Sequence, residues 1–331
     1  MVSIIIPVFN RAKIIGETLD SIISQSYRDW ECIIVDDGST DETIKVINQF
    51  IGKDDRFKLF ERPKNRPKGA NACRNFGFEQ AKGEYINWFD SDDIMHPDFL
   101  KLKRGILDND QSLDFCACIS RKFVDTVDEK AEEDRPLVLN SNNYIEDYLL
   151  HGLYFSTPSP MWRTSFLKGK DLFDEALHRS QERDFHFRML THNPNYFYLE
   201  EVLFYVRVEG DSISTRSKTS LKAQTSVFNY FHKVFDHLNN NENVPNRETL
   251  LQYVFYRQAT NYYNINQLSN GFKQRFNILS SKGKSLKQYC KSTKQLSKHS
   301  RHISIGFMLV LFLNKGYKYF YFPQYDYAKK G

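Results

Sequence analysis

Short apolar runs alternate with segments of helical spacing over the first hundred residues, and this alternation limits the fold more than any other feature. The runs at 2–6, 31–35, 57–60 and 85–89 have the length and the β-branched or aromatic content of buried strands. The segments between them, such as 14–23, place apolar residues at helical spacing. Strands that alternate with helices favour a parallel sheet covered by helices on both faces.

Two of these predicted strands end in carboxylates. Asp36 and Asp37 follow one strand, and the tetrapeptide Asp90–Asp93 follows another. The carboxyl ends of parallel strands meet at one edge, where open α/β sheets bind ligands. Three carboxylates within four residues repel one another unless a positive charge lies among them, and a divalent cation carrying a phosphorylated ligand would supply it. The alternative is a charged turn, since Asp and Ser also favour turns.

Five motifs resemble family 2 glycosyltransferases and occur in that family's order and spacing. They are Val2–Asn10, Ile33–Asp41, Ala72–Asn75, Gly83–Ile86 and Phe89–Asp93. The resemblance implies a GT-A fold, an α/β architecture with a mostly parallel twisted sheet flanked by helices. It assigns a nucleotide-sugar-binding half to residues 1–100 and an acceptor-side half to 101–214, so that 1–214 would form the glycosyltransferase domain.

The resemblance also implies roles for individual residues on the nucleotide side. Pro7 and Phe9 would line the base pocket. Asp37 would hydrogen-bond the base, which favours a pyrimidine nucleotide, and Asp36 would lie beside it. The predicted nucleotide-sugar site is completed by Arg74, Asn75, Asp90 and Ser91.

Asp90 and Asp92 are the outer members of the family's Asp-x-Asp motif. The resemblance makes Asp92 the expected metal ligand and Asp90 a ribose or metal contact. Mg²⁺ or Mn²⁺ favours oxygen ligands and would neutralise the charge that develops on a nucleoside diphosphate leaving group. The family often has a further His ligand after a Tyr-Arg pair. This chain has Glu209 there, which either serves as an oxygen ligand or has lost the role.

The candidate base lies in the segment that precedes Arg188. Inverting transfer needs a carboxylate that takes the proton from the acceptor hydroxyl. The family usually presents the Asp of a Glu-Asp pair, six residues before an Arg. Counting back from Arg188 places Glu182 there and Gln181 before it, which departs from the pattern. Asp184 is the competing candidate, and both could instead be helix-start charges that favour the macrodipole. His186 is expected to be a packing or surface residue.

Residues 215–331 are expected to form a helical, basic extension. The part at 271–331 holds 13 Lys and Arg residues and one acidic residue. A basic helix beside an aromatic, Lys-flanked segment suits an anionic membrane surface, and a lipid-linked acceptor would give that surface a purpose. The alternative is a helical subdomain that packs on the body or on another subunit. No recognition motif for nucleic acid accompanies the charge, so no nucleic-acid partner is expected.

The N-terminal sequence and the hydropathy pattern favour a cytoplasmic protein. No basic leader precedes the strand at 2–6, and no apolar run reaches the ~18 residues of a transmembrane helix. The five cysteines lack metal-site spacing and are expected to be reduced, mostly buried thiols. Peripheral attachment to the cytoplasmic face of a membrane is the alternative to a freely soluble protein.

Together these features predict an inverting glycosyltransferase that moves a sugar from a UDP-sugar to a glycan or lipid-linked acceptor. Two alternatives stay open. A sugar-phosphate nucleotidyltransferase shares the broad α/β plan, but it normally begins with a Gly-rich phosphate loop, which is absent after Pro7. A non-catalytic module would keep the fold without the base, as the pair Gln181-Glu182 suggests.

Overall fold

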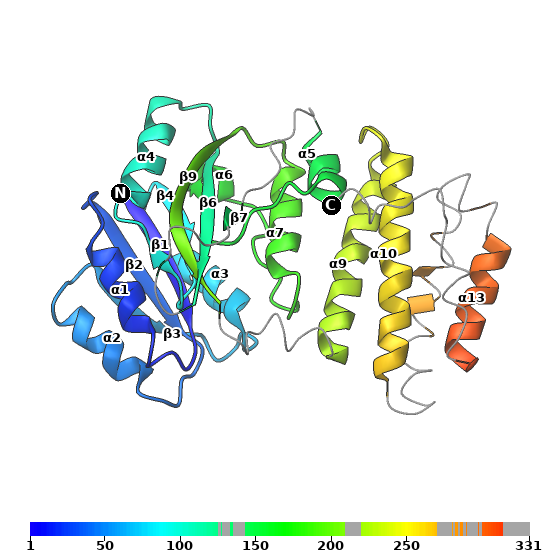
Figure 1. Cartoon of the computed structure of the whole chain (residues 1–331), viewed down its shortest axis with the longest axis horizontal. Coiled ribbons are helices and arrows are strands. Elements are labelled where there is room, and N and C mark those ends of the chain that lie inside the picture. Colours follow the sequence, from blue (N-terminus) through cyan, green and yellow to red (C-terminus); the bar gives the residue numbers. More distant parts are fainter. Residues whose placement is uncertain are drawn as a thin grey trace. The chain divides into compact units, whose positions relative to one another are not determined.

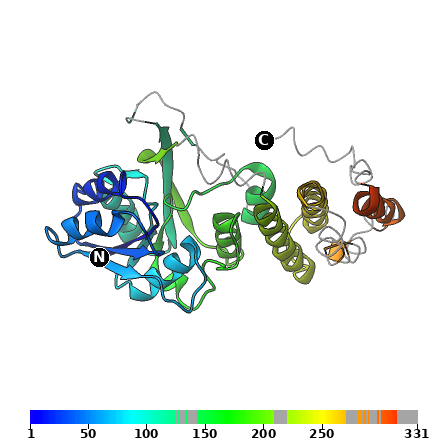
Figure 2. The ribbon, with the colours of Figure 1, turned by 90° about the horizontal axis from the view of Figure 1, so that it is seen from below.

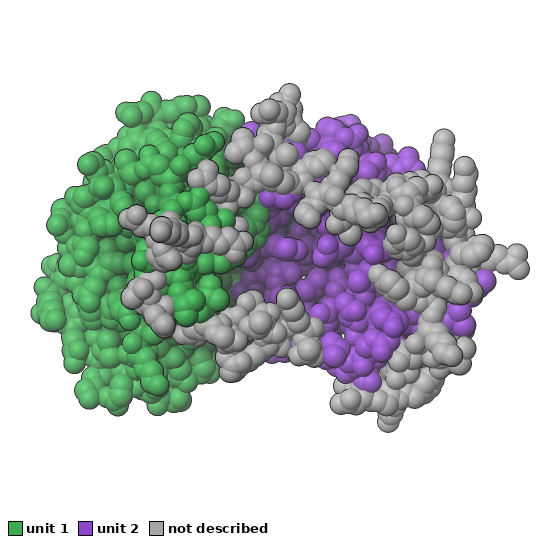
Figure 3. Space-filling view, viewed as in Figure 1, with its two compact units in different colours: residues 1–137, 154–176, 184–210 green, residues 138–153, 177–183, 211–331 purple. Residues whose placement is uncertain are grey.

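The computed structural model divides into two compact units (Figure 3). The residues that it describes are 1–124, 127, 133–134, 143–208, 220–269 and parts of 280–313. The first unit comprises residues 1–137, 154–176 and 184–210, and the second comprises 138–153, 177–183 and 211–331. The boundary expected between 214 and 215 lies outside the described residues.

Strands and helices alternate along the N-terminal part of the first unit (Figure 1), as the periodicity predicts. The elements are β1 (Val2–Val8), α1 (Ile15–Ile23), β2 (Trp30–Asp36), α2 (Thr43–Ile51), β3 (Phe57–Glu61), α3 (Ala70–Gln80) and β4 (Tyr85–Trp88). The remaining elements are β5 (Ile94–Met95), α4 (Phe99–Asn109), β6 (Phe115–Phe123), β7 (Glu133–Asp134), β8 (Met161–Arg163), α6 (Thr164–Leu167), α7 (Gln181–Leu190) and β9 (Tyr196–Arg207).

In the described part of the chain, nine strands form one sheet in the order β3-β2-β1-β4-β8-β6-β9-β5, with β7 paired to β6. The run β3-β2-β1-β4 is parallel throughout, and the other half is mixed, with β8 antiparallel to both of its neighbours. Helices flank this sheet (Figures 1 and 2), which confirms the predicted fold class. In register, Val8 lies opposite Asp36, so β1 and β2 end at the same edge.

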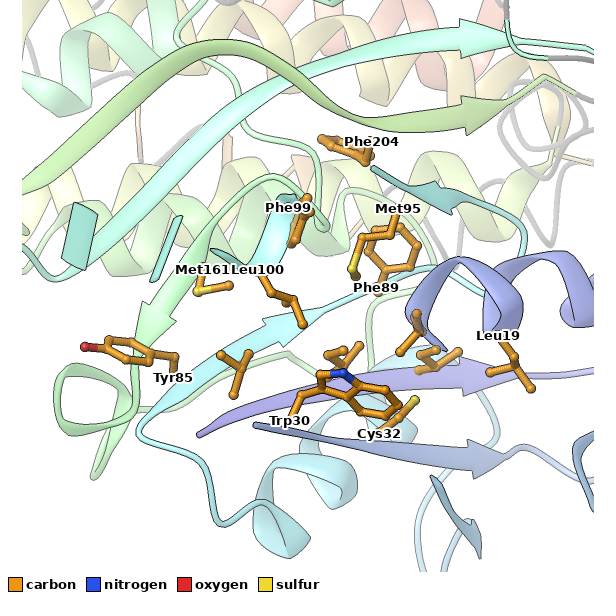
Figure 4. Packing of buried hydrophobic residues seen from close by; sticks show 14 of the residues in the cluster. Leu19, Trp30, Cys32, Tyr85, Phe89, Met95, Phe99, Leu100, Met161 and Phe204 are labelled. Carbon is orange, nitrogen blue, oxygen red and sulfur yellow. The ribbon is translucent and has the colours of Figure 1, made fainter. Parts of the chain in front are cut away.

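The core of the first unit fixes where the acidic tetrapeptide begins. Strands β1, β2 and β4 bury every residue, as parallel strands covered on both faces do. The rings of Phe89, Phe99 and Phe204 contact one another edge to face, with centroids 6.0 to 6.3 Å apart (Figure 4). Phe89 is therefore held in the core, and Asp90, the next residue, emerges at the sheet edge.

Helix α3 lies unusually close to β1 because residue 77 is glycine. A Cβ atom built at Gly77 would lie 2.4 Å from Cγ2 of Ile5 and 3.4 Å from Cγ2 of Val35. Any side chain at this position would force the helix away from the sheet. Gly77 thereby sets the distance at which Arg74, one turn earlier, approaches the sheet edge.

The second unit is helical in its described residues, as the sequence predicts for the C-terminal part. It contains α5 (Tyr144–Glu146), the π-helical turn η1 (Asp147–His151), α9 (Leu221–Asn240), α10 (Arg247–Leu268) and α13 (Ser300–Leu313). Helices α9 and α10 pack side by side (Figure 1). Their buried stripes include the expected apolar residues Phe228, Phe231, Val234, Phe235, Leu238, Leu250, Leu251, Val254, Phe255 and Tyr262.

Two further expectations can be compared with the described residues. Four cysteines, Cys32, Cys73, Cys116 and Cys118, are buried free thiols, as predicted. None of the helices in the described ranges combines the length and the apolar character needed to cross a bilayer.

Candidate functional site

The carboxyl ends of β1 and β2 form a tight turn that is shaped by Asp36. The N–H of Asp37 donates to the carbonyl of Val8 at 2.9 Å, which joins the two strand ends. The buried Asp36 carboxylate accepts the backbone N–H groups of Gly38 and Ser39, each at 2.9 Å. Gly38 has a φ of 84°, in the left-handed region that glycine adopts without strain. Asp36 therefore stabilises the turn that presents its neighbour Asp37.

Asp37 is paired with an arginine that the sequence did not single out. The Nε of Arg62, the first residue after β3, donates to Asp37 Oδ1 at 2.5 Å, and both side chains are largely buried. The same guanidinium donates to the carbonyls of Pro63 and Arg66, so it is fixed from several sides. β3 runs parallel to β2, so Arg62, the first residue after β3, lies at the same sheet edge as Asp37. Its position directly after a strand could have identified Arg62 from the sequence.

Phe9 presents an aromatic ring at this edge, directly after β1. It is 40% exposed, whereas Pro7 is buried within the strand. The Nζ of Lys68 lies 3.8 Å from the ring centroid, which is the geometry of a cation–π contact. The Asn10 N–H donates to Ser39 Oγ, and the Thr40 N–H donates to Asn10 Oδ1, so that this loop is tied to the turn after β2. The ring is therefore accessible on a loop that is anchored.

The acidic tetrapeptide after β4 carries its positive partners within the protein. An Arg74 guanidinium nitrogen donates to Asp90 Oδ1 at 2.8 Å, and one from Arg11 donates to Asp92 Oδ2 at 3.1 Å. The side chains of Asp90 and Asp92 are 34% and 26% exposed, so both stay open to solvent. Ser91 between them is buried. Asp90 and Asp92 thus lie directly after β4 with carboxylates that are partly open to solvent.

The acidic turn is held by the buried residue Asp93 and by Arg207, the last residue of β9. Burial, followed by the nearby charges of Asp90 and Asp92, raises the pKa of Asp93 well above its usual value. The backbone N–H of Arg207 donates to Asp93 Oδ1 at 3.1 Å, and its Nε donates to the Asp92 carbonyl at 3.1 Å. The same guanidinium pairs with Glu17 of α1 at 2.6 Å. Arg207 therefore joins β9, the acidic turn and α1.

Three arginines, Arg11, Arg74 and Arg207, thus supply the positive charge that the carboxylate cluster requires. The described residues contain no group of three or more His, Cys, Asp or Glu that could hold a metal ion. The oxygen donors offered to a cation are those of Asp90 and Asp92. Two carboxylates suit a hard divalent ion whose other ligands are water and substrate phosphates, so the residues present fit Mg²⁺ or Mn²⁺.

Arg74 and Asn75 are neighbours on α3 but have different partners. Arg74 is buried, with its guanidinium carbon 5.2 Å from the Phe173 ring centroid, and it faces the acidic turn. The amide of Asn75 donates to the Phe173 carbonyl at 2.8 Å and accepts the Phe173 N–H at 3.0 Å. It also donates to Glu175 Oε1 at 3.0 Å. Asn75 therefore fastens the segment at 173–175 to α3.

The two candidate bases differ in their surroundings. Glu182 lies in the first turn of α7, is half-buried and belongs to the second unit. Ser180, which precedes the helix, has a φ of 59°, a strained conformation for a residue other than glycine. Asp184 is 1% exposed, and its Oδ2 accepts Arg188 Nε at 3.0 Å and a second guanidinium nitrogen at 2.7 Å. Arg188 also donates to two backbone carbonyls of the preceding loop.

His186 is a packing residue, in agreement with the sequence-based expectation. Its ring contacts Phe155, Trp162 and Phe185, and burial lowers its pKa to about 3. The imidazole is therefore neutral at physiological pH. Glu209, the predicted third metal ligand, lies outside the described residues.

A sequence model of glycosyl transferase family 2 matches residues 3–168, half of the chain. The chain therefore belongs to this family, and the predicted family membership is confirmed. An uncharacterized glycosyltransferase of Haemophilus influenzae is 46% identical over 101 residues, which are 30% of this chain and 40% of that protein. The chondroitin synthase of Pasteurella multocida is 27% identical over 252 residues, 72% of this chain and 25% of that protein. The chain thus matches less than half the length of either relative.

Solved structures share the fold at low sequence identity. S. aureus TarS 1-349 in complex with UDP-GlcNAc has a TM-score of 0.61 at 18% identity, over 94% of this chain and 93% of that one. A mannosyltransferase from Pyrobaculum calidifontis in complex with GDP-Man and Mn²⁺ has a TM-score of 0.55 at 15% identity, over 95% and 87%. These similarities show the GT-A fold, and the neighbours themselves bind nucleotide sugars.

Proposed function

We propose that this protein is an inverting glycosyltransferase that transfers a sugar from a nucleoside diphosphate donor, a UDP-sugar, to a glycan or lipid-linked acceptor. The observation that carries the proposal is the single sheet edge at which Phe9, Asp37, Asp90 and Asp92 lie in a family 2 chain. The exposed ring of Phe9 suits stacking on a nucleotide base, and the buried carboxylate of Asp37 suits the polar edge of that base. The pair Asp90 and Asp92 suits a metal-bound diphosphate.

The donor's base would stack on Phe9 and hydrogen-bond to Asp37. Arg62 holds the Asp37 carboxylate in one orientation, which favours a fixed pattern of base recognition. Asp36 supports this arrangement through the turn, and Pro7 supports it through the strand. The UDP-GlcNAc bound to TarS supports a UDP-sugar as the donor class.

Asp92, with Asp90, would hold Mg²⁺ or Mn²⁺, which when bound neutralises the negative charge of the departing diphosphate. The Mn²⁺ in the structure of the mannosyltransferase neighbour supports this assignment. Arg74 keeps Asp90 oriented toward the edge, Ser91 fills the buried position between the two carboxylates, and Asn75 supports the helix that carries Arg74. Glu209 stays a candidate for a further oxygen ligand.

Glu182 is the proposed base. Its carboxylate takes the proton of the acceptor hydroxyl while that oxygen bonds to the anomeric carbon, and the bond from this carbon to the diphosphate oxygen breaks on the opposite face. Asp184 is the weaker candidate, because its carboxylate already forms a buried ion pair with Arg188. The strained backbone at Ser180 supports a functional role for the start of α7.

The acceptor class and the cellular location are proposed from one relative and from the charge of the C-terminal segment. The similarity to a chondroitin synthase supports a glycan acceptor, and the basic segment at 271–331 supports attachment to an anionic membrane on its cytoplasmic side. Replacing Lys291, Lys294 and Lys298 by Gln in the full chain should weaken binding to vesicles that contain anionic lipid. Unchanged binding would favour the alternative, in which the extension packs on protein.

The donor assignment is tested by thermal stabilisation with a panel of nucleotide sugars in the presence of Mn²⁺, followed by transfer assays. Asp92→Ala should lose the metal-dependent stabilisation by UDP. Glu182→Gln should keep donor binding and reduce turnover by about 100-fold or more, whereas Glu200→Gln, an exposed position on β9, should leave turnover unchanged. Full turnover in Glu182→Gln would mean that the base is another residue.

The same assays separate the alternative functions. Formation of a glycoside from a UDP-sugar and an acceptor, with release of UDP, is the product pattern of a glycosyltransferase. Release of pyrophosphate from a sugar 1-phosphate and UTP, supplied in place of the UDP-sugar, would indicate a nucleotidyltransferase. Donor binding without turnover on any acceptor would indicate a non-catalytic module.

A further inference from the structure

Arg11 is the least constrained of the three arginines at the acidic turn. Arg74 is buried against Phe173, and Arg207 holds three partners at once. The Arg11 guanidinium donates to Asp92 Oδ2 at 3.1 Å, and no second partner for it lies within the described residues. Its side chain is 27% exposed. A single contact at a solvent-accessible position is easily exchanged.

The backbone of Arg11 is fixed, so that only the side chain is free to move. Its N–H donates to Thr43 Oγ1 at 2.7 Å, and its carbonyl accepts the N–H groups of Ile14 and Ile15 at 3.1 and 2.9 Å. These bonds hold Arg11 between the first residue of α2 and the start of α1. A change of rotamer would break the ion pair with Asp92 without disturbing either element.

Asp92 is the fixed member of the pair. Its carbonyl accepts Arg207 Nε at 3.1 Å, and the next residue, Asp93, is buried and bonded to the Arg207 N–H. The backbone that carries this carboxylate is therefore held at one place on the edge, while the cation that approaches the carboxylate can be replaced. The Arg11 guanidinium occupies Oδ2 of Asp92, an oxygen that a divalent ion bound to this carboxylate would also use.

We propose that Arg11 and a divalent cation compete for the Asp92 carboxylate, and that the donor's diphosphate ends the competition by binding the released guanidinium. This inference rests on the proposed function of Asp92 as a metal ligand. Guanidinium groups bind phosphate oxygens through two parallel hydrogen bonds, so the diphosphate is a suitable second partner. Arg11 would then make the affinity for the cation low without nucleotide and high with it. By linkage, the bound cation would raise the affinity for the nucleotide by the same factor.

The test measures Mn²⁺ binding, not turnover. The electron paramagnetic resonance signal of free Mn²⁺ decreases as protein is added, and the titration is carried out with and without UDP. Arg11→Gln should bind Mn²⁺ alone about fivefold more tightly than the wild type, the size expected for loss of a partly exposed ion pair. The ratio of its Mn²⁺ affinities with and without UDP should fall by at least the same factor. Arg11→Lys, which keeps the charge, should stay close to the wild type for Mn²⁺ alone.

Arg104→Gln is the matched control. Arg104 forms an ion pair of similar exposure with Asp108 on α4, at 2.6 Å, and does not contact the acidic turn. It should leave both Mn²⁺ affinities unchanged. An Arg11→Gln protein that binds Mn²⁺ alone no more tightly than the wild type overturns the proposed competition.

Asp92→Asn separates this inference from the function on which it rests. If Asp92→Asn abolishes UDP-dependent Mn²⁺ binding while Arg11→Gln changes nothing, the metal ligand is correct and the role of Arg11 is refuted. If Asp92→Asn retains that binding, or if no form of the protein binds Mn²⁺ with UDP, both assignments fail.

Discussion

Replacing two helix-interior glycines by alanine should have opposite effects on stability, because only one of them touches the sheet. Gly77 on α3 faces β1, where a Cβ atom would lie 2.4 Å from Cγ2 of Ile5. Gly105 on α4 would place its Cβ in open space, with no atom within 4 Å. The two substitutions add the same methyl group to the same kind of backbone, so each is the other's control.

The expected magnitudes follow from helix propensity and packing. Alanine is favoured over glycine by about 1 kcal/mol in a helix interior, and Gly105→Ala should gain this amount. Gly77→Ala also overfills a packed core, which typically costs about 1–3 kcal/mol. Ile5 is fully buried and β-branched, so it cannot rotate away, and the upper part of that range applies. The net loss should be about 2 kcal/mol, a difference of about 3 kcal/mol between the variants.

Tryptophan fluorescence during urea unfolding is the appropriate measurement. All three tryptophans, Trp30, Trp88 and Trp162, are buried in the first unit, so their signal follows that unit alone. Gly77→Ala should also weaken UDP binding, because the displaced helix carries Arg74 away from Asp90. Equal midpoints for the two variants, or a more stable Gly77→Ala, would refute the packing argument.

Three further outcomes follow from the site. The folded wild type keeps the His186 imidazole neutral, with a pKa of about 3, whereas the unfolded chain takes up a proton there between pH 7 and pH 5. The free energy of unfolding of the wild type should therefore fall by about 2 kcal/mol over this range, and His186→Leu should remove this loss. A wild type whose stability is equal at both pH values would contradict this. Asp184→Asn should destabilise the first unit by about 3 kcal/mol in a urea titration, because Arg188 loses its buried partner. A loss below about 1 kcal/mol would argue for an exposed, functional Asp184. Arg62→Gln should weaken UDP binding, because the Asp37 carboxylate loses the guanidinium that orients it, while the Mn²⁺ affinity of the UDP complex should not change; calorimetry measures both. Unchanged UDP affinity would show that this ion pair has no role in base recognition.

The sequence predicted those helices and strands in which the spacing of apolar residues repeats several times. Strand and helix spacing located β1 to β4 and the buried stripes of α9 and α10, and the strand-end rule located Asp37, Asp90 and Asp92 on one edge. Strands β5 and β8 were missed because two or three residues are too few to show a period.

The partners of the acidic residues could not be predicted in the same way. Arg11 and Asp92 are 81 positions apart, and Arg62 and Asp37 are 25 apart, so each pair depends on strand order and register. The expected counter-charge was assigned to a metal ion alone, whereas arginines from α3, from β9 and from the loop after β1 also supply it. Asp184 and Arg188 have the spacing of a helical ion pair, but the burial of that pair depends on tertiary packing.

Arg207 also has a mechanical consequence for the chain. It is the last residue of β9, and the polypeptide that follows Val208 continues into the second unit. A pull on that connecting segment would first load the bonds from Arg207 to Asp93, Asp92 and Glu17, together with the bond from the Val208 N–H to Phe123. Most of the first bonds to carry tension from the extension are therefore those that hold the acidic turn, so force applied to the C-terminal part would act directly on this turn.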